Sequence, residues 1–337
     1  MKLITKSERI FVAGSNGMAG SAIVKKLELC GYGSKKLGGK ILTPSSKELD
    51  LMNLNQTLNW FEENKPTVVV LAAAKVGGIL ANASYPADFI LNNLKIQTNV
   101  IETSWKFNIK RFIFLGSSCI YPKHAPQPIV EDYLLSSNLE QTNESYALAK
   151  IAGLKLCHAL RIQYGFDAIT LMPTNLYGPK DNYKDNDSHV MASLIKKFSL
   201  AVKFNYDKVI CWGSGKPLRE FMHVDDLADA VVFALENWDP SSKKAPKDKE
   251  GKPLTYLNVG TGKEISIKLL AEEIAKLVDY KGNIIWDKSK PDGTLRKNLS
   301  IEKFKKLGWS PKIKLSEGLK MTLKNFQVEQ DNKFSQL

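Results

Sequence analysis

The stretch Arg9-Ile-Phe-Val-Ala-Gly-Ser-Asn-Gly-Met-Ala-Gly20 carries the clearest fold signal in this chain. Its first five residues have the apolar character of a short buried strand. Glycines follow at positions 14, 17 and 20, and a helical pattern then runs from Met18 to Cys30. A turn this tight lets a pyrophosphate approach the backbone N–H groups where a helix begins. The stretch therefore predicts a strand–turn–helix unit that binds a dinucleotide.

Outward from this unit, strand and helix patterns alternate through the first half of the chain. We expect strands over residues 40–43, 67–74, 111–116 and 167–172, and helices over residues 92–107 and 144–164. The alternation is typical of an α/β fold with a doubly wound parallel sheet of Rossmann type.

The pattern changes after Pro179. Residues 181–188 are polar and irregular, and helices are expected over 225–236 and 265–278. We interpret Trp238–Pro253 as a surface insertion. The predicted organisation is a nucleotide-binding domain over 1–179, to which segments near 220–240 and 255–262 return. A smaller C-terminal domain, mainly for substrate, covers 180–330.

Composition narrows the function classes. The 337 residues contain 48 Lys and Arg against 35 Asp and Glu, a net charge of +13. A basic surface attracts polyanions, but the chain has no nucleic-acid-binding motif, so no nucleic-acid partner is expected. It has no apolar run long enough to span a membrane and no signal-peptide core, so we expect no membrane partner and a cytoplasmic location. The four cysteines lack metal-site spacing, so no metal is expected, and Cys30, Cys157 and Cys211 look like ordinary small apolar residues.

A reductase constellation lies in the middle of the chain. Tyr146 and Lys150 are one helical turn apart, on the same helix face. We expect the Lys150 ammonium to lower the pKa of the Tyr146 phenol, which can then exchange a proton with a carbonyl as hydride arrives. Ser117, at the end of the preceding strand, can donate to the same oxygen.

The segment after the second strand bears on the cofactor. NAD enzymes usually place an acid there for the ribose 2′-hydroxyl. No acid follows Thr43 directly, whereas Ser46 and Lys47 could meet a 2′-phosphate. This favours NADP over NAD.

Five stretches together carry a resemblance to a known family: GSSCIYP (116–122), YALAKIAG (146–153), MPTNLYGP (172–179), DSHV (187–190) and WGSGKPLREFMHVDD (212–226). With the G-x-x-G-x-x-G spacing of residues 14–20, the chain resembles the extended short-chain dehydrogenases that act on nucleotide sugars, over nearly its whole length. The resemblance implies 3,5-epimerisation of GDP-4-keto-6-deoxy-D-mannose, then NADPH-dependent reduction at C4 to GDP-L-fucose.

Epimerisation needs a base on one face of the sugar ring and an acid on the other. By resemblance, Cys119 is the base and His189 the acid, beside the set of Ser117, Tyr146 and Lys150. A thiol needs an activating neighbour to act as a base, and a histidine beside Cys119 is the neighbour we expect. The remaining histidines, which we expect to be non-catalytic, are His124, His158 and His223.

The resemblance also implies binding residues. Asn16 and Ser46 stand where NADP-preferring members often carry Arg. Trp212 would face guanine or the sugar, Lys197 and Arg219 the diphosphate, and Asp292 the nucleotide. A homodimer is expected, with helices 92–107 and 144–164 forming a bundle across a two-fold axis. The implied cofactor-binding residues are Gly14, Ser15, Asn16, Gly17, Met18, Ala19, Gly20, Ser46, Lys47, Leu115, Gly116, Lys150, Pro173, Thr174, Asn175, Leu176 and His189.

Three alternatives stay open at this point. An enzyme that makes a related deoxysugar, such as GDP-colitose, would share most of this machinery. An epimerase that acts on dTDP- or UDP-sugars with bound NAD would not need Cys119 and His189. A non-catalytic nucleotide- or RNA-binding scaffold would fit the charge of +13, but it would need none of the catalytic set.

Overall fold

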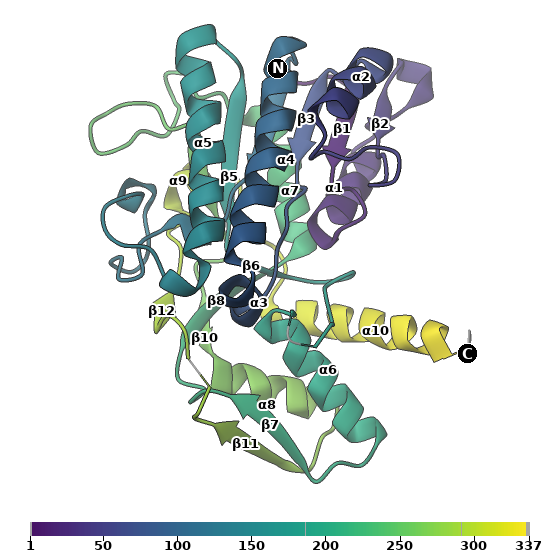
Figure 1. Ribbon diagram of the computed structural model, residues 1–337, viewed down its shortest axis with the longest axis vertical. Coiled ribbons are helices and arrows are strands. Elements are labelled where there is room, and N and C mark those ends of the chain that lie inside the picture. The colour runs from purple at the N-terminus through teal and green to yellow at the C-terminus, as the bar shows by residue number, and fades with distance from the viewer. Residues whose placement is uncertain (1, 186, 291, 335–337) are drawn as a thin grey trace.

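The computed structural model describes residues 2–185, 187–290 and 292–334 (Figure 1). Within these residues, six strands form a sheet in the order β2-β1-β3-β4-β5-β9, and every neighbouring pair is parallel. The predicted doubly wound α/β fold is confirmed. The strands are β1 (Arg9–Ala13), β2 (Lys40–Leu42), β3 (Val68–Leu71), β4 (Arg111–Leu115), β5 (Ala168–Pro173) and β9 (Tyr256–Val259).

Helices bury both faces of this sheet. In β1, Ile10 and Val12 pack in one core cluster with helices α1 (Met18–Leu29) and α7 (Val224–Asn237). Phe11 and Ala13 point the other way. They pack in a second cluster with residues of α2 (Leu54–Asn64), α4 (Pro86–Lys106) and α5 (Glu144–Tyr164). Burial on both faces explains why the strand reads as continuously apolar.

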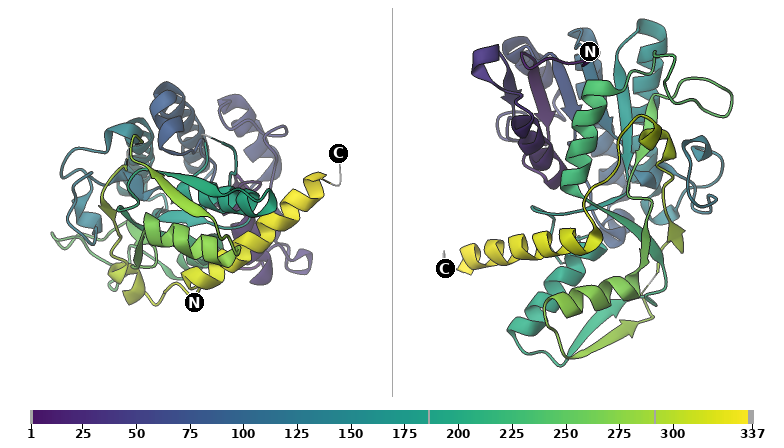
Figure 2. Two further views of the ribbon diagram at one scale, coloured as in Figure 1. Left: turned by 90° about the horizontal axis from the view of Figure 1, so that it is seen from below. Right: turned by 180° about the vertical axis from the view of Figure 1, so that it is seen from behind.

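A smaller part lies below the sheet in Figure 1. Its own core is built around Ile195, Phe198 and Ile274. Helix α10 (Leu315–Phe334) projects from the junction of the two parts, as Figure 2 also shows. The remaining elements here are β6 (Asn175–Tyr177), α6 (Val190–Lys203), β7 (Lys208–Trp212), β8 (Leu218–His223), β10 (Glu264–Ser266), α8 (Ile267–Leu277), β11 (Asn283–Asp287) and β12 (Arg296–Lys297).

Several boundaries differ from the sequence expectations. β3 ends at Leu71 because the chain then leaves the sheet. Helix α4 begins at Pro86, earlier than expected, since proline is well suited to the first turn of a helix. Helix α2 was not expected; the side chain of its N-cap, Asn53, accepts a hydrogen bond from the Gln56 backbone N–H. Short helices also occur: η1 (Lys35–Leu37), α3 (Ile79–Ser84), η2 (Ser118–Ile120), η3 (Glu131–Tyr133), η4 (Gln141–Asn143) and α9 (Glu302–Lys306).

The interpretation of Trp238–Pro253 as a surface insertion is wrong at its start. Trp238 is fully buried and packs near Phe304, with 6.5 Å between ring centroids. Trp238 is the C-cap of α7, and its large indole ring joins the core beside Phe304 of α9, which hydrophobic burial favours. Further along, the backbone N–H of Lys249 donates to the Asp132 carboxylate at 2.7 Å, so the segment is attached to η3.

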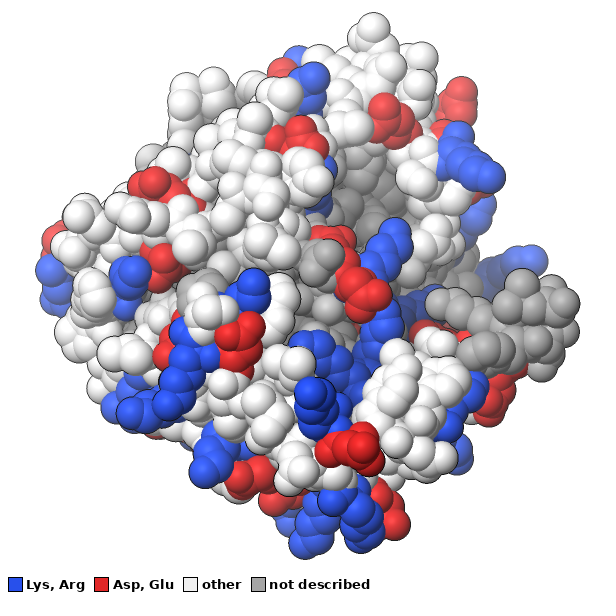
Figure 3. All heavy atoms as spheres, turned by 60° about the horizontal axis from the view of Figure 1, so that its bottom comes forward, with Lys and Arg blue, Asp and Glu red and all other residues white. Residues whose placement is uncertain are grey.

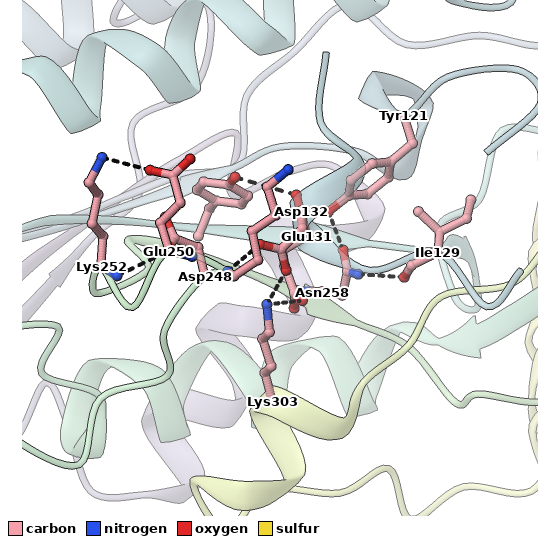
Figure 4. Close-up of polar contacts among 11 residues, drawn as sticks. Tyr121, Ile129, Glu131, Asp132, Asp248, Glu250, Lys252, Asn258 and Lys303 are labelled. Atoms are coloured by element: carbon pink, nitrogen blue, oxygen red, sulfur yellow. Dashed lines mark hydrogen bonds and ion pairs between the residues drawn. The ribbon is translucent and has the colours of Figure 1, made fainter. Parts of the chain in front are cut away.

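A buried polar network ties the loop after η2 to β9 and α9 (Figure 4). The Tyr121 hydroxyl donates to the side-chain oxygen of Asn258 at 2.6 Å, and the Asn258 amide donates to the Ile129 carbonyl at 3.0 Å. The Asn258 backbone N–H donates to the Glu131 carboxylate, which also lies 3.4 Å from the Lys303 ammonium. Burial raises the pKa of Glu131. Because each buried polar group here has a partner, the loop has one well-defined position.

No helix among the described residues is both long enough and apolar enough to cross a membrane.

Candidate active site

A cavity of about 960 Å³ lies where the carboxyl ends of the parallel strands meet the smaller part. This edge is where open α/β sheets hold their ligands. The residues after β1, β4 and β5 line one side of it, and residues of α6, β7, β8 and β12 line the other. A volume of this size suits a large organic ligand.

The glycine turn forms a cradle at one end of the cavity. Gly14 has φ +84°, and a Cβ there would lie 2.7 Å from the Ala73 backbone nitrogen. A Cβ on Gly20 would overlap the Gly14 carbonyl oxygen. Gly17 is the N-cap of α1 with φ −77°, and it borders the cavity with room beside it. The hydroxyl of Ser15 is buried without a protein partner, so these residues fit a nicotinamide dinucleotide whose pyrophosphate lies on the N-terminus of α1.

The cavity lining after β2 differs from the expectation at one residue. Asn16 and Ser46 both line the cavity. Lys47 is exposed and does not line the cavity, because the chain turns it outward after Ser46. The described lining between residues 44 and 52 contains no cation and one acid, Asp50, so Ser46 and Asn16 are the neutral polar side chains in this part of the cavity.

Tyr146 and Lys150 lie on α5 as predicted, but the expected effect on the phenol is wrong. Burial raises the pKa of Tyr146, and the nearby charge of Cys119 raises it further, against hydrogen bonding with Ser117. The ammonium of Lys150 points to the Leu115 carbonyl at 2.8 Å, not to the phenol. Burial also lowers the pKa of Lys150 to about 7. Tyr146 therefore keeps its phenolic proton at neutral pH.

Ser117 and Cys119 follow β4 directly. The Ser117 side chain accepts a hydrogen bond of 3.1 Å from the Cys119 backbone N–H, which fixes the short helix η2. Its hydroxyl also lies within hydrogen-bonding reach of the Cys119 thiol and the Tyr146 phenol. Both side chains line the cavity beside Tyr146, where a carbonyl oxygen can meet Ser117 and Tyr146 together.

The activating neighbour of Cys119 is not the expected histidine. The ammonium of Lys297 lies 3.3 Å from the Cys119 sulfur. Burial acts to raise the pKa of Cys119, but the charge of Lys297, hydrogen bonds from Ser117 and Lys297, and the charge of Arg219 together lower it. The thiolate form of Cys119 is thus favoured by Lys297, which belongs to none of the sequence motifs.

His189 is the N-cap of α6, and its ring makes no capping hydrogen bond. The His189 side chain lines the cavity, and solvent in the cavity reaches it. Protein atoms enclose its other sides. Enclosure lowers the pKa of His189, Asp187 opposes this shift and Lys297 adds to it. The Asp187 carbonyl accepts a hydrogen bond of 3.0 Å from the Gly78 N–H, which holds this loop against the segment after β3.

The predicted substrate residues line the other half of the cavity. Trp212 is 45% exposed, with the ammonium of Lys197 5.7 Å from its ring centroid. Arg219 also lines the cavity, where burial lowers its pKa and the nearby charges of Cys119 and Asp292 oppose this shift. Asp292 accepts hydrogen bonds from the backbone and hydroxyl of Ser214, at 2.6 and 2.7 Å, so it also fixes the turn after β7.

Cations outnumber acids along the described lining, which favours a diphosphate ligand. Figure 3 shows Lys and Arg side chains gathered beside a hollow on the face that it turns forward. Lys297 is the functional candidate that the sequence patterns missed. The lining contains the cations Lys75, Lys150, Lys196, Lys197, Arg219 and Lys297 and the acids Asp50, Glu140, Asp185 and Asp292.

Comparisons with known proteins agree with this geometry. The model of the NAD dependent epimerase/dehydratase family matches residues 10–246. GDP-L-fucose synthase 1 of Arabidopsis thaliana is 49% identical over 317 residues, which are 94% of this chain and 92% of the relative. The GDP-L-fucose synthase of Escherichia coli (strain K12) is 44% identical over 324 residues, 96% of this chain and 98% of the relative. GDP-L-colitose synthase of Yersinia pseudotuberculosis is 36% identical over 325 residues, 96% and 99% of the two chains.

Solved structures match the whole architecture. A GDP-6-OMe-4-keto-L-xylo-heptose reductase from C. jejuni superimposes with a TM-score of 0.87 at 35% identity, covering 97% of this chain and 99% of that one. A GDP-mannoheptose C4 reductase from Campylobacter jejuni, with NADP bound, gives a TM-score of 0.83 at 35% identity, covering 96% and 99%.

Proposed function

The chain belongs to the NAD dependent epimerase/dehydratase family, and from this premise we propose that it converts GDP-4-keto-6-deoxy-D-mannose to GDP-L-fucose. The reaction inverts C3 and C5 and then reduces C4 with NADPH. The resemblance that the motifs predicted is thereby confirmed at the level of the family, and the identities of 44–49% to GDP-L-fucose synthases support this product.

One observation carries the proposal: Cys119 and His189 line the same cavity as Ser117, Tyr146 and Lys150. A plain reductase needs only the last three. A thiol of lowered pKa and an imidazole in the same cavity add the base and acid that epimerisation requires.

Epimerisation uses the acidity that the 4-keto group gives to the neighbouring carbons. The Cys119 thiolate takes the proton from C3 or C5, and the electron pair of the C–H bond moves to the C4 oxygen. Ser117 and Tyr146 donate hydrogen bonds to that oxygen and stabilise the enolate. His189 in its protonated form, which its lowered pKa makes a stronger acid, returns a proton on the opposite face and so inverts the carbon.

Reduction uses the same oxygen site. A nicotinamide cofactor, when bound, would supply the hydride for C4. Tyr146 gives its phenolic proton to the C4 oxygen. The raised pKa of Tyr146 ensures that the phenol is protonated before this step. Lys150, through its bond to Leu115, keeps the helix that carries Tyr146 aligned with the strand that leads to Ser117.

We propose NADPH as the reductant and a division of labour between the two parts. The larger sheet and the cradle of Gly14, Gly17 and Gly20 would hold the cofactor, and the smaller part would hold the GDP-sugar. A relative solved with NADP bound supports this choice. At the substrate end, Trp212 would stack on an aromatic or sugar ring, and Arg219 would pair with the diphosphate.

We also propose a homodimer through α4 and α5. These neighbouring helices expose Leu91, Leu148, Ile162 and Tyr164, which are apolar side chains that a two-fold partner would cover. A cytoplasmic location remains a prediction.

The test is an assay in deuterated water with GDP-4-keto-6-deoxy-D-mannose and NADPH, with the product analysed by NMR. We expect oxidation of the cofactor and deuterium at C3 and C5. In Cys119→Ser the exchange should fall at least about 100-fold, and Cys30→Ser, outside the cavity lining, serves as the matched control. Oxidation without exchange would leave only a 4-reductase, and faster turnover of the 3-deoxy analogue would point to a colitose-type product.

A further inference from the structure

Lys297 lies in contact with the sulfur of Cys119. The distance of 3.3 Å between Lys297 Nζ and Cys119 Sγ suits a hydrogen bond from an ammonium to a thiolate. The two residues come from β12 and η2 and are far apart in the sequence. The fold brings them together at the point where the proposed reaction needs an ionised base.

The backbone around Lys297 is held on both sides. On one side, β12 pairs with β8 in a register that sets Lys297 opposite Arg219. Paired residues of neighbouring strands point to the same face, and both side chains line the cavity. On the other side, the Asn298 N–H donates to the Gln127 side chain at 2.8 Å, and the Ile129 N–H donates to the Asn298 carbonyl at 2.8 Å. The backbone position of Lys297 is therefore well defined, and its side chain extends into the cavity from there.

Among the described residues, Lys297, Arg219 and Tyr146 interact with the thiol from different elements, and His189 lines the same cavity. Lys297 and Arg219 favour the thiolate, and Lys297 does so by charge and by a hydrogen bond whereas Arg219 acts by charge alone. Tyr146 of α5 is neutral, and burial keeps its pKa above the ordinary value. His189 of α6 lies on the same cavity, and the Lys297 charge opposes its protonation.

We propose that Lys297 is a positioning residue that holds Cys119 as a thiolate and aims its sulfur into the cavity. The catalytic meaning rests on the proposed function; the contact itself does not. When Cys119 acts, an S–H bond forms, a C–H bond breaks, and the electron pair moves to the C4 oxygen. Lys297 takes no part in the proton transfer and acts through its contact with the sulfur.

The first test needs no substrate. The intact protein is alkylated with iodoacetamide between about pH 5 and 10, and the Cys119 peptide is quantified by mass spectrometry, with Cys30 as the internal reference. We expect the midpoint of Cys119 to lie below that of an ordinary thiol. In Lys297→Met the midpoint should rise by about one pH unit, which lowers the rate at pH 7 roughly tenfold. Lys297→Arg should restore most of the shift because it restores the charge.

The same variants separate positioning from mere structural support. If Lys297 acts through the thiolate, deuterium exchange at C3 and C5 slows in Lys297→Met at neutral pH and recovers as pH rises, while the Kd for NADPH is unchanged. Slow exchange at every pH with an unshifted thiol titration would overturn the proposal. If Lys297→Met does not fold, the wild-type titration still decides, because a Cys119 midpoint at or above that of Cys30 contradicts the proposal. The expected titrations without turnover would mean that the proposed function, and not the role of Lys297, is wrong.

Discussion

The ammonium of Lys150 donates a hydrogen bond of 2.8 Å to the backbone carbonyl of Leu115, the last residue of β4. Lys150 is 3% exposed, and burial lowers its pKa to about 7. The bond joins the helix of Tyr146 to the strand that ends just before Ser117, so one side chain aligns the two groups that meet the carbonyl oxygen. Because burial lowers the pKa of Lys150, the stability of the fold also depends on pH.

The first prediction concerns Lys150→Met. Between about pH 7 and the ordinary lysine pKa near 10.5, the unfolded chain binds more protons at this position than the folded one. The Lys150 contribution therefore makes the folded protein more stable as pH rises through this window and less stable below it. Lys150→Met lacks this contribution. The free energy of unfolding of the variant, measured relative to wild type, should therefore be higher at about pH 6 than at about pH 9.5. Urea unfolding of both proteins at several pH values measures the difference, and a difference that does not change with pH would contradict the buried lysine.

The second prediction compares two glycines of the same turn. In Gly20→Ala the new Cβ would overlap the Gly14 carbonyl oxygen, which cannot move without opening the turn, so the free energy of unfolding should fall by about 3 kcal/mol. In Gly17→Ala the nearest atom lies at an ordinary 3.5 Å, and the protein should fold normally. Its Kd for NADPH should instead rise about tenfold, because the methyl group stands where the pyrophosphate approaches. Urea denaturation and fluorescence titration separate the two effects, and equal stability of both variants would count against the cradle.

The third prediction separates reduction from epimerisation. Tyr146→Phe removes the proton donor for the C4 oxygen, so oxidation of NADPH should slow by about 10²–10⁴-fold. Deuterium exchange at C3 and C5 should persist at a lower rate, because Ser117 still donates to the enolate oxygen and Cys119 is unchanged. Single-turnover absorbance and NMR on the same sample measure both rates. Loss of exchange as complete as that in Cys119→Ser would mean that Tyr146 itself is needed for proton removal.

The features predicted correctly from the sequence are those that depend on neighbouring residues. The glycine turn, β1 and the Tyr146–Lys150 pair depend on residues a few positions apart, where side-chain size and helical spacing are decisive. The pKa of Tyr146 was expected in the wrong direction because it depends on burial by distant segments and on where Lys150 points. The spacing of residues along a helix predicts neither the burial of Tyr146 nor the direction of the Lys150 side chain.

Long-range packing produced the remaining differences. Lys297 lies in a strand of two residues, too short to leave a pattern, and it reaches Cys119 through the pairing of β12 with β8. Trp238 begins a polar segment, yet its ring is buried beside Phe304, which is far along the chain. Neither contact is visible until the chain is folded.

The last prediction concerns the 2′-phosphate of the cofactor. Ser46 lines the cavity after β2, and the described lining from 44 to 52 contains no cation. Ser46→Arg adds a guanidinium that can pair with a phosphate through two hydrogen bonds. Because NADH lacks that phosphate, the Kd for NADPH should fall about tenfold while the Kd for NADH stays within about twofold. Lys47→Ala is the matched control, since Lys47 lies outside the lining, and it should change neither Kd more than about twofold. Fluorescence titration with both cofactors decides, and an equal gain for NADH and NADPH in Ser46→Arg would mean that the 2′-phosphate lies elsewhere.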